Sequence, residues 1–141
     1  MKLLDRTKKP TSQNSPLRLL LDSSTIIFSF EYPLSNSRIV FDLVVAGKLK
    51  GFISEKAIFE TKSVFSTSKD ERFLFLLEKI LRKNFQVVQI TQVEKEMQKW
   101  QGKIKEKDLA HLATAKALKL PYIIAFDRDF EPFPEYYTPK K

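Results

Sequence analysis

Acidic residues stand at positions where an α/β enzyme could use them for chemistry. Asp22 follows the apolar run 19–21 and Asp127 follows a second apolar run, while Glu60 and Asp108 fall on expected helices. A carboxylate directly after a buried parallel strand lies at the carboxyl edge of the sheet, where open α/β sheets build their sites. Metal-dependent cleavage of phosphodiester bonds is the chemistry that this pattern favours.

The ligand types in the chain restrict the metal. The sequence contains no cysteine and one histidine, which excludes disulfides, thiolate metal sites and cysteine nucleophiles and removes the usual zinc-ligand combinations. Oxygen ligands would therefore have to hold the ion, and they favour Mg²⁺ or Mn²⁺. Clustered carboxylates also require a cation, because unit charges about 4 Å apart repel by about 4 kcal/mol at an effective dielectric of about 20.

The charge balance of the chain points to a polyanionic partner. Its 141 residues carry 25 Lys and Arg against 17 Asp and Glu, a formal net charge of +8. A basic surface around an acidic site can attract nucleic acid toward the cations that act on it. A Lys-rich surface that serves solubility alone is an equally open interpretation.

Length and hydropathy predict one soluble domain. A hydrophobic content of 43% in 141 residues suffices for a single core. No apolar run approaches the roughly 18 residues of a membrane span, and the N-terminal stretch lacks the apolar centre of a signal peptide. We therefore expect a cytoplasmic protein with no membrane partner. Residues 1–16 are expected to form a flexible basic tail, and residues 17–141 are expected to form a single domain.

Strand and helix signals alternate along the domain. Strands are expected at residues 17–21, 51–53, 85–90, 122–126 and 136–138. Helices are expected at 23–30, 38–46, 57–65, 69–83, 93–101 and 108–119, with Ser54 as the cap of the third. This order predicts a three-layer α/β/α sandwich with a central parallel sheet of four to five strands.

The expected topology brings the four acids to one crevice. Asp22 and Asp127 end strands at the carboxyl edge of the sheet, and Glu60 lies in the opening turns of a helix that leaves the same edge. Asp108 begins a helix that descends from that edge toward the fourth strand. All four carboxylates can therefore meet without any loop folding back.

The motifs around these acids resemble the PIN domain family. The resemblance runs from about residue 17 to residue 139 and depends on the order of several short motifs. These are 20–24 (LLDSS), Ile53-Ser54 with Glu60 downstream, 107–115 (KDLAHLATA), 124–130 (IAFDRDF) and Thr138-Pro139. The family fold that this implies is the three-layer sandwich already expected from the pattern.

The resemblance implies a Mg²⁺- or Mn²⁺-dependent ribonuclease. Many members of this kind are VapC-like toxins of type II toxin–antitoxin pairs, so the implied partners are RNA and an antitoxin protein, with homodimers frequent. By position, the resemblance assigns the catalytic and metal-binding quartet to Asp22, Glu60, Asp108 and Asp127. It makes Asp129 an auxiliary metal-binding acid.

Substrate contacts are expected from residues beside the acids. The resemblance makes Ser24 the hydroxyl next to the first aspartate, and Arg128, Lys107 and His111 are further candidates near the RNA. One departure from the family pattern is Ala125, because a Thr or Ser often stands two residues before the fourth acid. The missing hydroxyl puts the efficiency of cleavage in doubt more than metal binding.

Each of these residues also has a purely structural interpretation. Asp22 and Asp108 could cap their own helices, and Glu60 could be an ordinary exposed helix residue. Asp127 and Asp129 flank an arginine and could form a solvated turn. The remaining alternatives are packing for His111 and a solvated loop for Lys103, Lys105 and Lys107.

Competing functions come from other classes of protein. A haloacid-dehalogenase-type phosphatase needs a second aspartate where this chain has Ser24, and a receiver domain needs an acidic pair that the N-terminal segment lacks. A catalytically weak PIN-like domain that binds RNA or protein is the serious alternative. On the helix at 69–83, Phe73, Leu76, Leu77 and Ile80 form the expected core stripe, which leaves Phe75 facing outward as a candidate homodimer contact.

Overall fold

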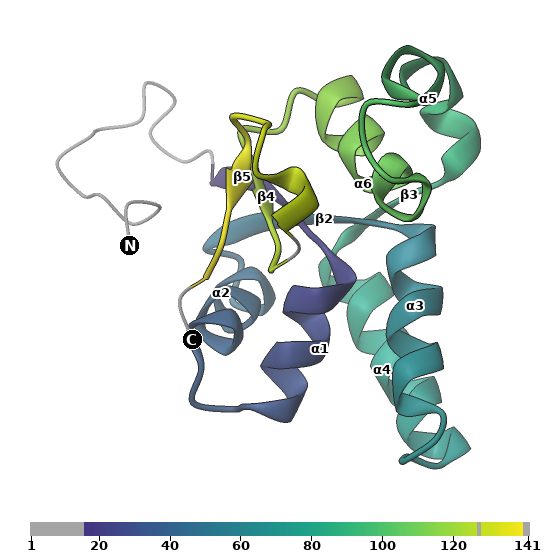
Figure 1. The fold of residues 1–141 in the computed structure, drawn as a ribbon. Helices are drawn as coiled ribbons and strands as arrows, with labels where there is room; N and C mark the ends of the chain where they lie inside the picture. The colour runs from purple at the N-terminus through teal and green to yellow at the C-terminus, as the bar shows by residue number, and fades with distance from the viewer. Residues whose placement is uncertain (1–15, 127, 140–141) are drawn as a thin grey trace, which may run out of the picture.

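A five-stranded parallel sheet forms the centre of the protein. The computed structural model describes residues 16–126 and 128–139, so Asp127 and all but the last position of the expected tail lie outside the described residues. The strand order is β3-β2-β1-β4-β5, with β1 in the middle (Figure 1). The strands are β1 (Leu17–Leu21), β2 (Leu49–Ser54), β3 (Gln86–Val88), β4 (Tyr122–Ile124) and β5 (Tyr136–Tyr137). All adjacent strands pair in parallel.

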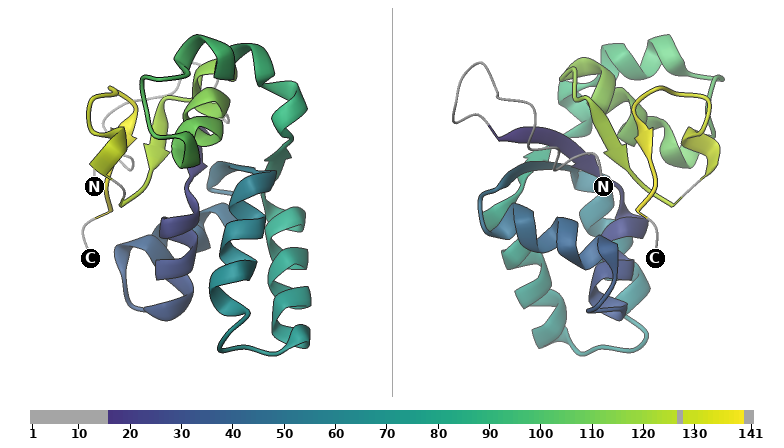
Figure 2. Two further views of the ribbon diagram at one scale, coloured as in Figure 1. Left: turned by 45° about the vertical axis from the view of Figure 1, so that its right-hand side comes forward. Right: turned by 90° about the vertical axis from the view of Figure 1, so that its left-hand side faces the viewer.

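Helices cover both faces of the sheet, which confirms the expected three-layer α/β/α sandwich. Figure 2 shows α1 to α4 on one side of the sheet and α5 and α6 on the other. Their bounds are α1 (Ser23–Glu31), α2 (Asn36–Val45), α3 (Glu55–Phe65), α4 (Glu71–Asn84), α5 (Glu94–Trp100) and α6 (Glu106–Ala117). None of the helices in the described part of the chain combines the length and apolarity needed to cross a membrane.

The three leucines at the end of β1 explain why this strand is central. Leu19 and Leu21 pack into the core beneath α1 to α4, whereas Leu20 packs into the second core beneath α5 and α6. Successive side chains of a strand point to opposite faces, so only a strand covered on both sides buries three apolar residues in a row. The central position of β1 places the residue that follows it in the middle of the carboxyl edge.

Capping side chains mark the start of three of the six α-helices among the described residues. The Ser54 side chain accepts a hydrogen bond from the Ala57 amide at 3.0 Å, which confirms it as the cap of α3. Ser35 and Asp70 cap α2 and α4 in the same way. These side chains satisfy amides that would otherwise lack a partner at the start of a helix. α6 begins at Glu106, two residues earlier than expected, so Asp108 lies within its first turn.

The expected core stripe of α4 is wrong at two positions. Leu76 and Ile80 are 45% and 38% exposed, and Leu77 and Leu81 are the buried residues of this helix. α4 packs mainly against α3 at the edge of the molecule, so it buries a narrower stripe than a helix that lies across the sheet. Phe75 is 66% exposed and faces outward as expected.

Candidate metal centre

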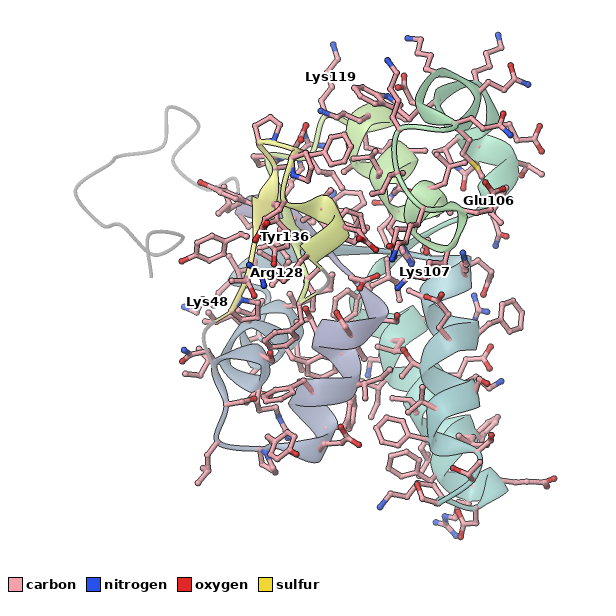
Figure 3. The ribbon with its side chains drawn as sticks, viewed as in Figure 1. Lys48, Glu106, Lys107, Lys119, Arg128 and Tyr136 are labelled. Carbon is pink, nitrogen blue, oxygen red and sulfur yellow. The ribbon has the colours of Figure 1, made fainter. Side chains whose placement is uncertain are left out.

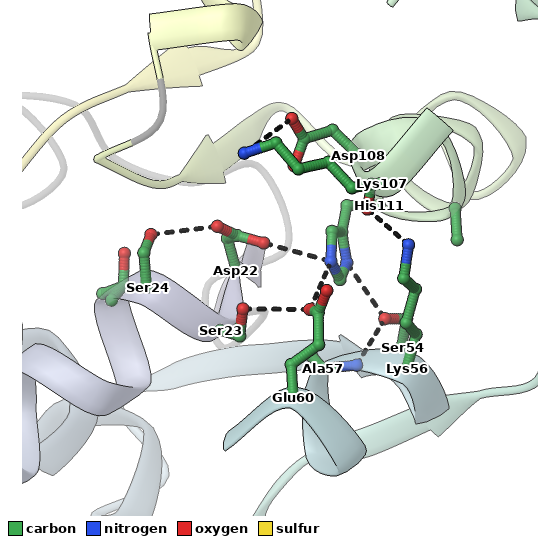
Figure 4. Close-up of polar contacts among 12 residues, drawn as sticks. Asp22, Ser23, Ser24, Ser54, Lys56, Ala57, Glu60, Lys107, Asp108 and His111 are labelled. Carbon is green, nitrogen blue, oxygen red and sulfur yellow. Dashed lines mark hydrogen bonds and ion pairs between the residues drawn. The ribbon is translucent and has the colours of Figure 1, made fainter. Parts of the chain in front are cut away.

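Asp22 lies at the carboxyl end of β1 with its side chain directed into a cluster of polar groups (Figure 4). Its backbone amide donates to the Ile124 carbonyl at 3.0 Å, which joins the ends of β1 and β4. Asp22 is the N-cap residue of α1, yet its side chain makes no capping hydrogen bond. The buried carboxylate is therefore available for contacts with other side chains, and the helix-cap interpretation does not account for it.

Ser24 binds the Asp22 carboxylate through its Oδ2 atom. The Ser24 hydroxyl donates to Asp22 Oδ2 at 2.9 Å and accepts a hydrogen bond from the Phe126 amide at 3.2 Å. This hydroxyl links the end of β1 to the residue that precedes Asp127 in the chain. The pair of bonds fixes the Asp22 rotamer and keeps the segment after β4 beside it.

Glu60 reaches the cluster from the second turn of α3. Its Oε1 atom accepts a hydrogen bond from the Ser23 hydroxyl at 3.0 Å and lies 3.1 Å from Nε2 of His111. Partial burial acts to raise the pKa of the Glu60 carboxyl, but the His111 hydrogen bond and charge and the Ser23 bond together lower it. The side chain is 33% exposed, so this carboxylate borders both the cluster and solvent.

His111 lies at the centre of the cluster. Its Nε2 atom is 3.1 Å from Asp22 Oδ1 as well as 3.1 Å from Glu60 Oε1, and its Nδ1 atom is 3.0 Å from the Ser54 hydroxyl. The residue is fully buried. Burial acts to lower the pKa of the imidazole, but the Asp22 charge and the Glu60 hydrogen bond outweigh this effect and raise the pKa above its ordinary value. The imidazole contacts in this structure are with the acids and Ser54.

Three side chains from three elements form a group that could hold a metal ion. One ligand atom each from Asp22, Glu60 and His111 lies within 4.8 Å of the other two. Asp108 stands one helical turn before His111 on α6 and is also buried, with Lys107 Nζ 3.9 Å from its Oδ2 atom. The structure thus brings two of the four predicted acids together, with Asp108 next to them outside that group (Figure 4).

The remaining candidates make contacts with residues outside the cluster. Asp129 Oδ2 is 3.4 Å from Lys105 Nζ, and Arg128 is 83% exposed beside Glu131. Lys56 Nζ donates to the Lys107 carbonyl and so joins the start of α3 to the start of α6. Figure 3 shows exposed basic side chains on several sides of the molecule: Lys48, Lys107, Lys119 and Arg128.

Sequence reasoning did not foresee the contacts that His111 and the serines make. Ser54 was expected as a helix cap alone, and Ser23 had no assigned contact with Glu60. The available signal for His111 was its spacing, because a residue three positions after Asp108 lies on the same side of a helix. Its partners are 51 and 57 residues away in the chain, so local pattern alone does not reveal them.

The fold agrees with comparison to known proteins. The sequence model of the PIN domain matches residues 19–135. The chain therefore belongs to the PIN domain family, which confirms the resemblance seen in the motifs and places it in a family of nucleases. A comparison with curated protein sequences gives no match.

Solved structures with the same fold come from toxin–antitoxin systems. A toxin–antitoxin complex from Klebsiella pneumoniae superposes with a TM-score of 0.67 at 21% identity, over 87% of this chain and 98% of that chain. VapBC2 from Rickettsia felis, bound to a promoter DNA fragment, gives 0.63 at 13% identity over 88% and 100%. VapC20 from Mycobacterium tuberculosis, a Sarcin-Ricin loop cleaving toxin, gives 0.62 at 15% identity over 81% and 93%. The TM-scores show that these proteins share the fold, and identities this low show the fold alone.

Proposed function

We propose that the protein is a Mg²⁺- or Mn²⁺-dependent endoribonuclease that hydrolyses phosphodiester bonds in RNA. The observation that carries this proposal is the approach of Asp22 and Glu60 to one another at the carboxyl edge of the sheet, in a chain of the PIN domain family. The fit of the residues to a divalent ion is supported by their chemistry, because the buried Asp22 carboxylate and the partly exposed Glu60 carboxylate lie close together and favour positive charge between them. The net charge of +8 supports attraction of RNA to this edge.

Residues of this chain would divide the work as follows. Asp22, Glu60, Asp108 and Asp127 hold the ion, with Asp129 as an auxiliary acid. A bound divalent ion supplies Lewis acidity toward a phosphate oxygen and lowers the pKa of water. Ser24 keeps the Asp22 carboxylate in one rotamer through the bond to Oδ2.

Exposed cations around the acids would bind and orient the RNA. Lys107 lies beside Asp108, Arg128 is exposed after β4, and both can pair with phosphates of the substrate. Hydrolysis at the edge of the sheet would leave a 5′-phosphate and a 3′-hydroxyl. The reaction needs no covalent intermediate, which suits a chain without cysteine and with its histidine fully buried.

Cleavage of RNA by the purified protein tests this proposal. We expect cleavage with Mn²⁺ or Mg²⁺, none with EDTA, and a loss of at least about 100-fold in Asp22→Asn and in Asp127→Asn, because each change keeps shape and removes a charge that holds the ion. Asp42→Asn is the matched control, since Asp42 is an exposed residue of α2 paired with Arg38. Wild-type cleavage by either Asp22→Asn or Asp127→Asn, with contaminating nuclease excluded, would reject the assignment.

A catalytically weak PIN-like domain that binds RNA or protein is the second candidate. The observation that favours it is Ala125, which is fully buried at the end of β4 and offers no hydroxyl there. The same assay separates the two candidates: RNA binding without metal-dependent cleavage supports the binding module.

We further propose an antitoxin protein as partner and the cytoplasm as the place of action. The proteins with the same fold include complexes of VapC-type toxins with their antitoxins, some bound to DNA. A hollow lined by Ile27, Phe59 and Val64 lies beside Glu60 and offers apolar surface to such a partner. Co-expression with a small protein encoded next to this one, followed by purification of a complex, tests the pairing.

A further inference from the structure

The imidazole of His111 faces the gap between the two carboxylates that contact it. Its Nε2 atom is 3.1 Å from Asp22 Oδ1 and 3.1 Å from Glu60 Oε1. We propose that Nε2 of His111 is itself a metal ligand, which makes the centre a mixed imidazole–carboxylate site selective for Mn²⁺ and later first-row divalent ions over Mg²⁺. This inference rests on the metal dependence proposed above and names the class of metal.

The two separations from Nε2 fit neighbouring ligands of one metal ion. Divalent ions of this size hold ligands at about 2.0–2.2 Å, and adjacent ligands of an octahedron are then about 3 Å apart. The two measured separations from Nε2 agree with that value, and all three atoms lie within 4.8 Å of one another. One nitrogen and two carboxylate oxygens resemble the mixed facial sites of first-row transition metals.

Ser54 orients the imidazole for this role. Its hydroxyl oxygen lies 3.0 Å from His111 Nδ1 and already accepts a hydrogen bond from the Ala57 amide, so its position is fixed by the start of α3. A metal-bound histidine almost always donates its other ring N–H to a neighbouring acceptor, and this contact fixes the tautomer. With Nδ1–H directed to Ser54, Nε2 would carry no proton and could offer its lone pair to a cation held by the two carboxylates.

Ligand chemistry then predicts the selectivity. Mg²⁺ prefers carboxylate and water oxygens in a near-ideal octahedron, whereas imidazole suits first-row transition ions. Affinity of one site for these ions rises from Mn²⁺ through Co²⁺ to Cu²⁺. An oxygen-only site, as the amino-acid composition predicts, would discriminate less strongly between Mg²⁺ and these transition ions. We therefore expect the wild-type protein to bind Mn²⁺ at least about 10-fold more tightly than Mg²⁺, with Co²⁺ tighter still.

Pulsed electron paramagnetic resonance on the Mn²⁺-loaded, untagged protein tests the inference directly. His111 is the only histidine of the chain, so any imidazole nitrogen coupled to the ion belongs to it. We expect this coupling in the wild type and its isotope change after labelling with ¹⁵N-histidine. A Mn²⁺ complex without imidazole coupling overturns the proposal. The wild-type spectrum needs no variant and therefore decides even if changes at this buried position prevent folding.

Variants add the thermodynamic part of the test. His111→Gln should raise the Mn²⁺ dissociation constant about 10–100-fold and the Mg²⁺ constant much less, and should abolish the nitrogen coupling. Equal losses for both ions mean that His111 only positions the acids, which rejects the proposal. Ser54→Ala should weaken Mn²⁺ binding about 10-fold and retain the coupling. Ser35→Ala, which removes a comparable helix cap from α2, should leave Mn²⁺ binding unchanged.

The outcomes separate this inference from the proposed function. Imidazole coupling without RNA cleavage keeps the metal assignment and rejects the nuclease. Metal-dependent cleavage without imidazole coupling keeps the nuclease and rejects His111 as a ligand.

Discussion

At the scale of single residues, the Ser24 hydroxyl joins the Asp22 carboxylate to the backbone after β4. It donates to Asp22 Oδ2 and accepts from the Phe126 amide, so its removal leaves one oxygen and one amide without that partner. We expect Ser24→Ala to destabilise the fold by about 1–2 kcal/mol and to weaken Mn²⁺ binding about 10-fold. Urea unfolding and a Mn²⁺ titration measure the two effects.

Ser66→Ala is the matched control for this change. Ser66 lies after α3 in an exposed position and donates to the Ser63 carbonyl. Ser66→Ala should change neither the free energy of unfolding nor the free energy of Mn²⁺ binding by more than about 0.5 kcal/mol. Metal affinity unchanged in Ser24→Ala would contradict a supporting role for its hydroxyl.

At the scale of elements, an ion network joins α3 to α4. Arg82 donates to Glu55 and Glu78, and Lys62 donates to Glu78. The hydrogen bond from Arg82 is the largest influence that lowers the pKa of Glu55, and the bond from Lys62 does the same for Glu78. A lowered folded-state pKa stabilises the fold above the unfolded pKa, and this stability disappears as the pH falls through the folded value.

The lowered pKa values of Glu55 and Glu78 predict how the stability of the Arg82→Met variant depends on pH. At pH 7 the variant should be less stable than the wild type by about 1 kcal/mol, a modest value because Arg82 is 40% exposed. The difference should shrink as the pH falls below about 5, where the carboxylates protonate. Urea unfolding at several pH values measures it. Arg38→Met, which removes one exposed i,i+4 pair, is the control, and an equal loss in both would contradict a network effect.

The packing of β2 against its covering helices requires a glycine. A Cβ atom at Gly51 would lie 2.6 Å from the Phe85 ring and 2.8 Å from Val44. Both neighbours are buried in the core, so a shift of either would disturb the packing around it. We expect Gly51→Ala to destabilise the protein by about 1–3 kcal/mol. Combining it with Phe85→Leu should recover part of the loss, and simple additivity of the two changes in urea unfolding would contradict the steric cause.

At the scale of the whole molecule, the proposed metal centre would couple three elements of the fold. Its candidate ligands come from the end of β1, from α3 and from α6, so an ion bound there would stabilise the folded state alone. Millimolar Mn²⁺ should raise the melting temperature by about 5–10 °C if it exceeds the dissociation constant about 100-fold. EDTA should reverse the shift, and Asp22→Asn should reduce it. A melting curve that does not respond to metal favours the binding-module alternative.

Self-association is the second property of the whole molecule that we propose. Phe75 is 66% exposed on the outer helix α4 and supplies apolar surface for a second copy. Phe75→Ser should shift a wild-type dimer toward monomer in sedimentation velocity. Ile39→Ser is the matched control, because Ile39 is 48% exposed on α2, and this change should leave the dimer unchanged. A monomeric wild type, or a dimer insensitive to Phe75→Ser, places any partner surface elsewhere.

The sequence alone determined the order of elements, the central strand and the positions of two acids at the sheet edge. Three buried leucines in β1 required cover on both faces, and Ser54 was recognisable as a cap from the residues around it. These features depend on neighbours along the chain, which local periodicity and capping chemistry describe. The positions of Asp22 and Glu60 could be predicted because parallel strands end at one edge of the sheet. Asp22 follows β1, and Glu60 lies on the helix that leaves the end of β2.

The tertiary structure decided which side chains meet. His111 contacts Glu60 and Ser54 across 51 and 57 residues, and no periodic pattern records such a contact. The buried face of α4 was likewise set by its place at the edge of the molecule, so Leu76 and Ile80 stayed partly exposed although their spacing suits a core. Periodicity fixes which residues share a helix face, but the neighbours that pack against the helix determine which face is buried.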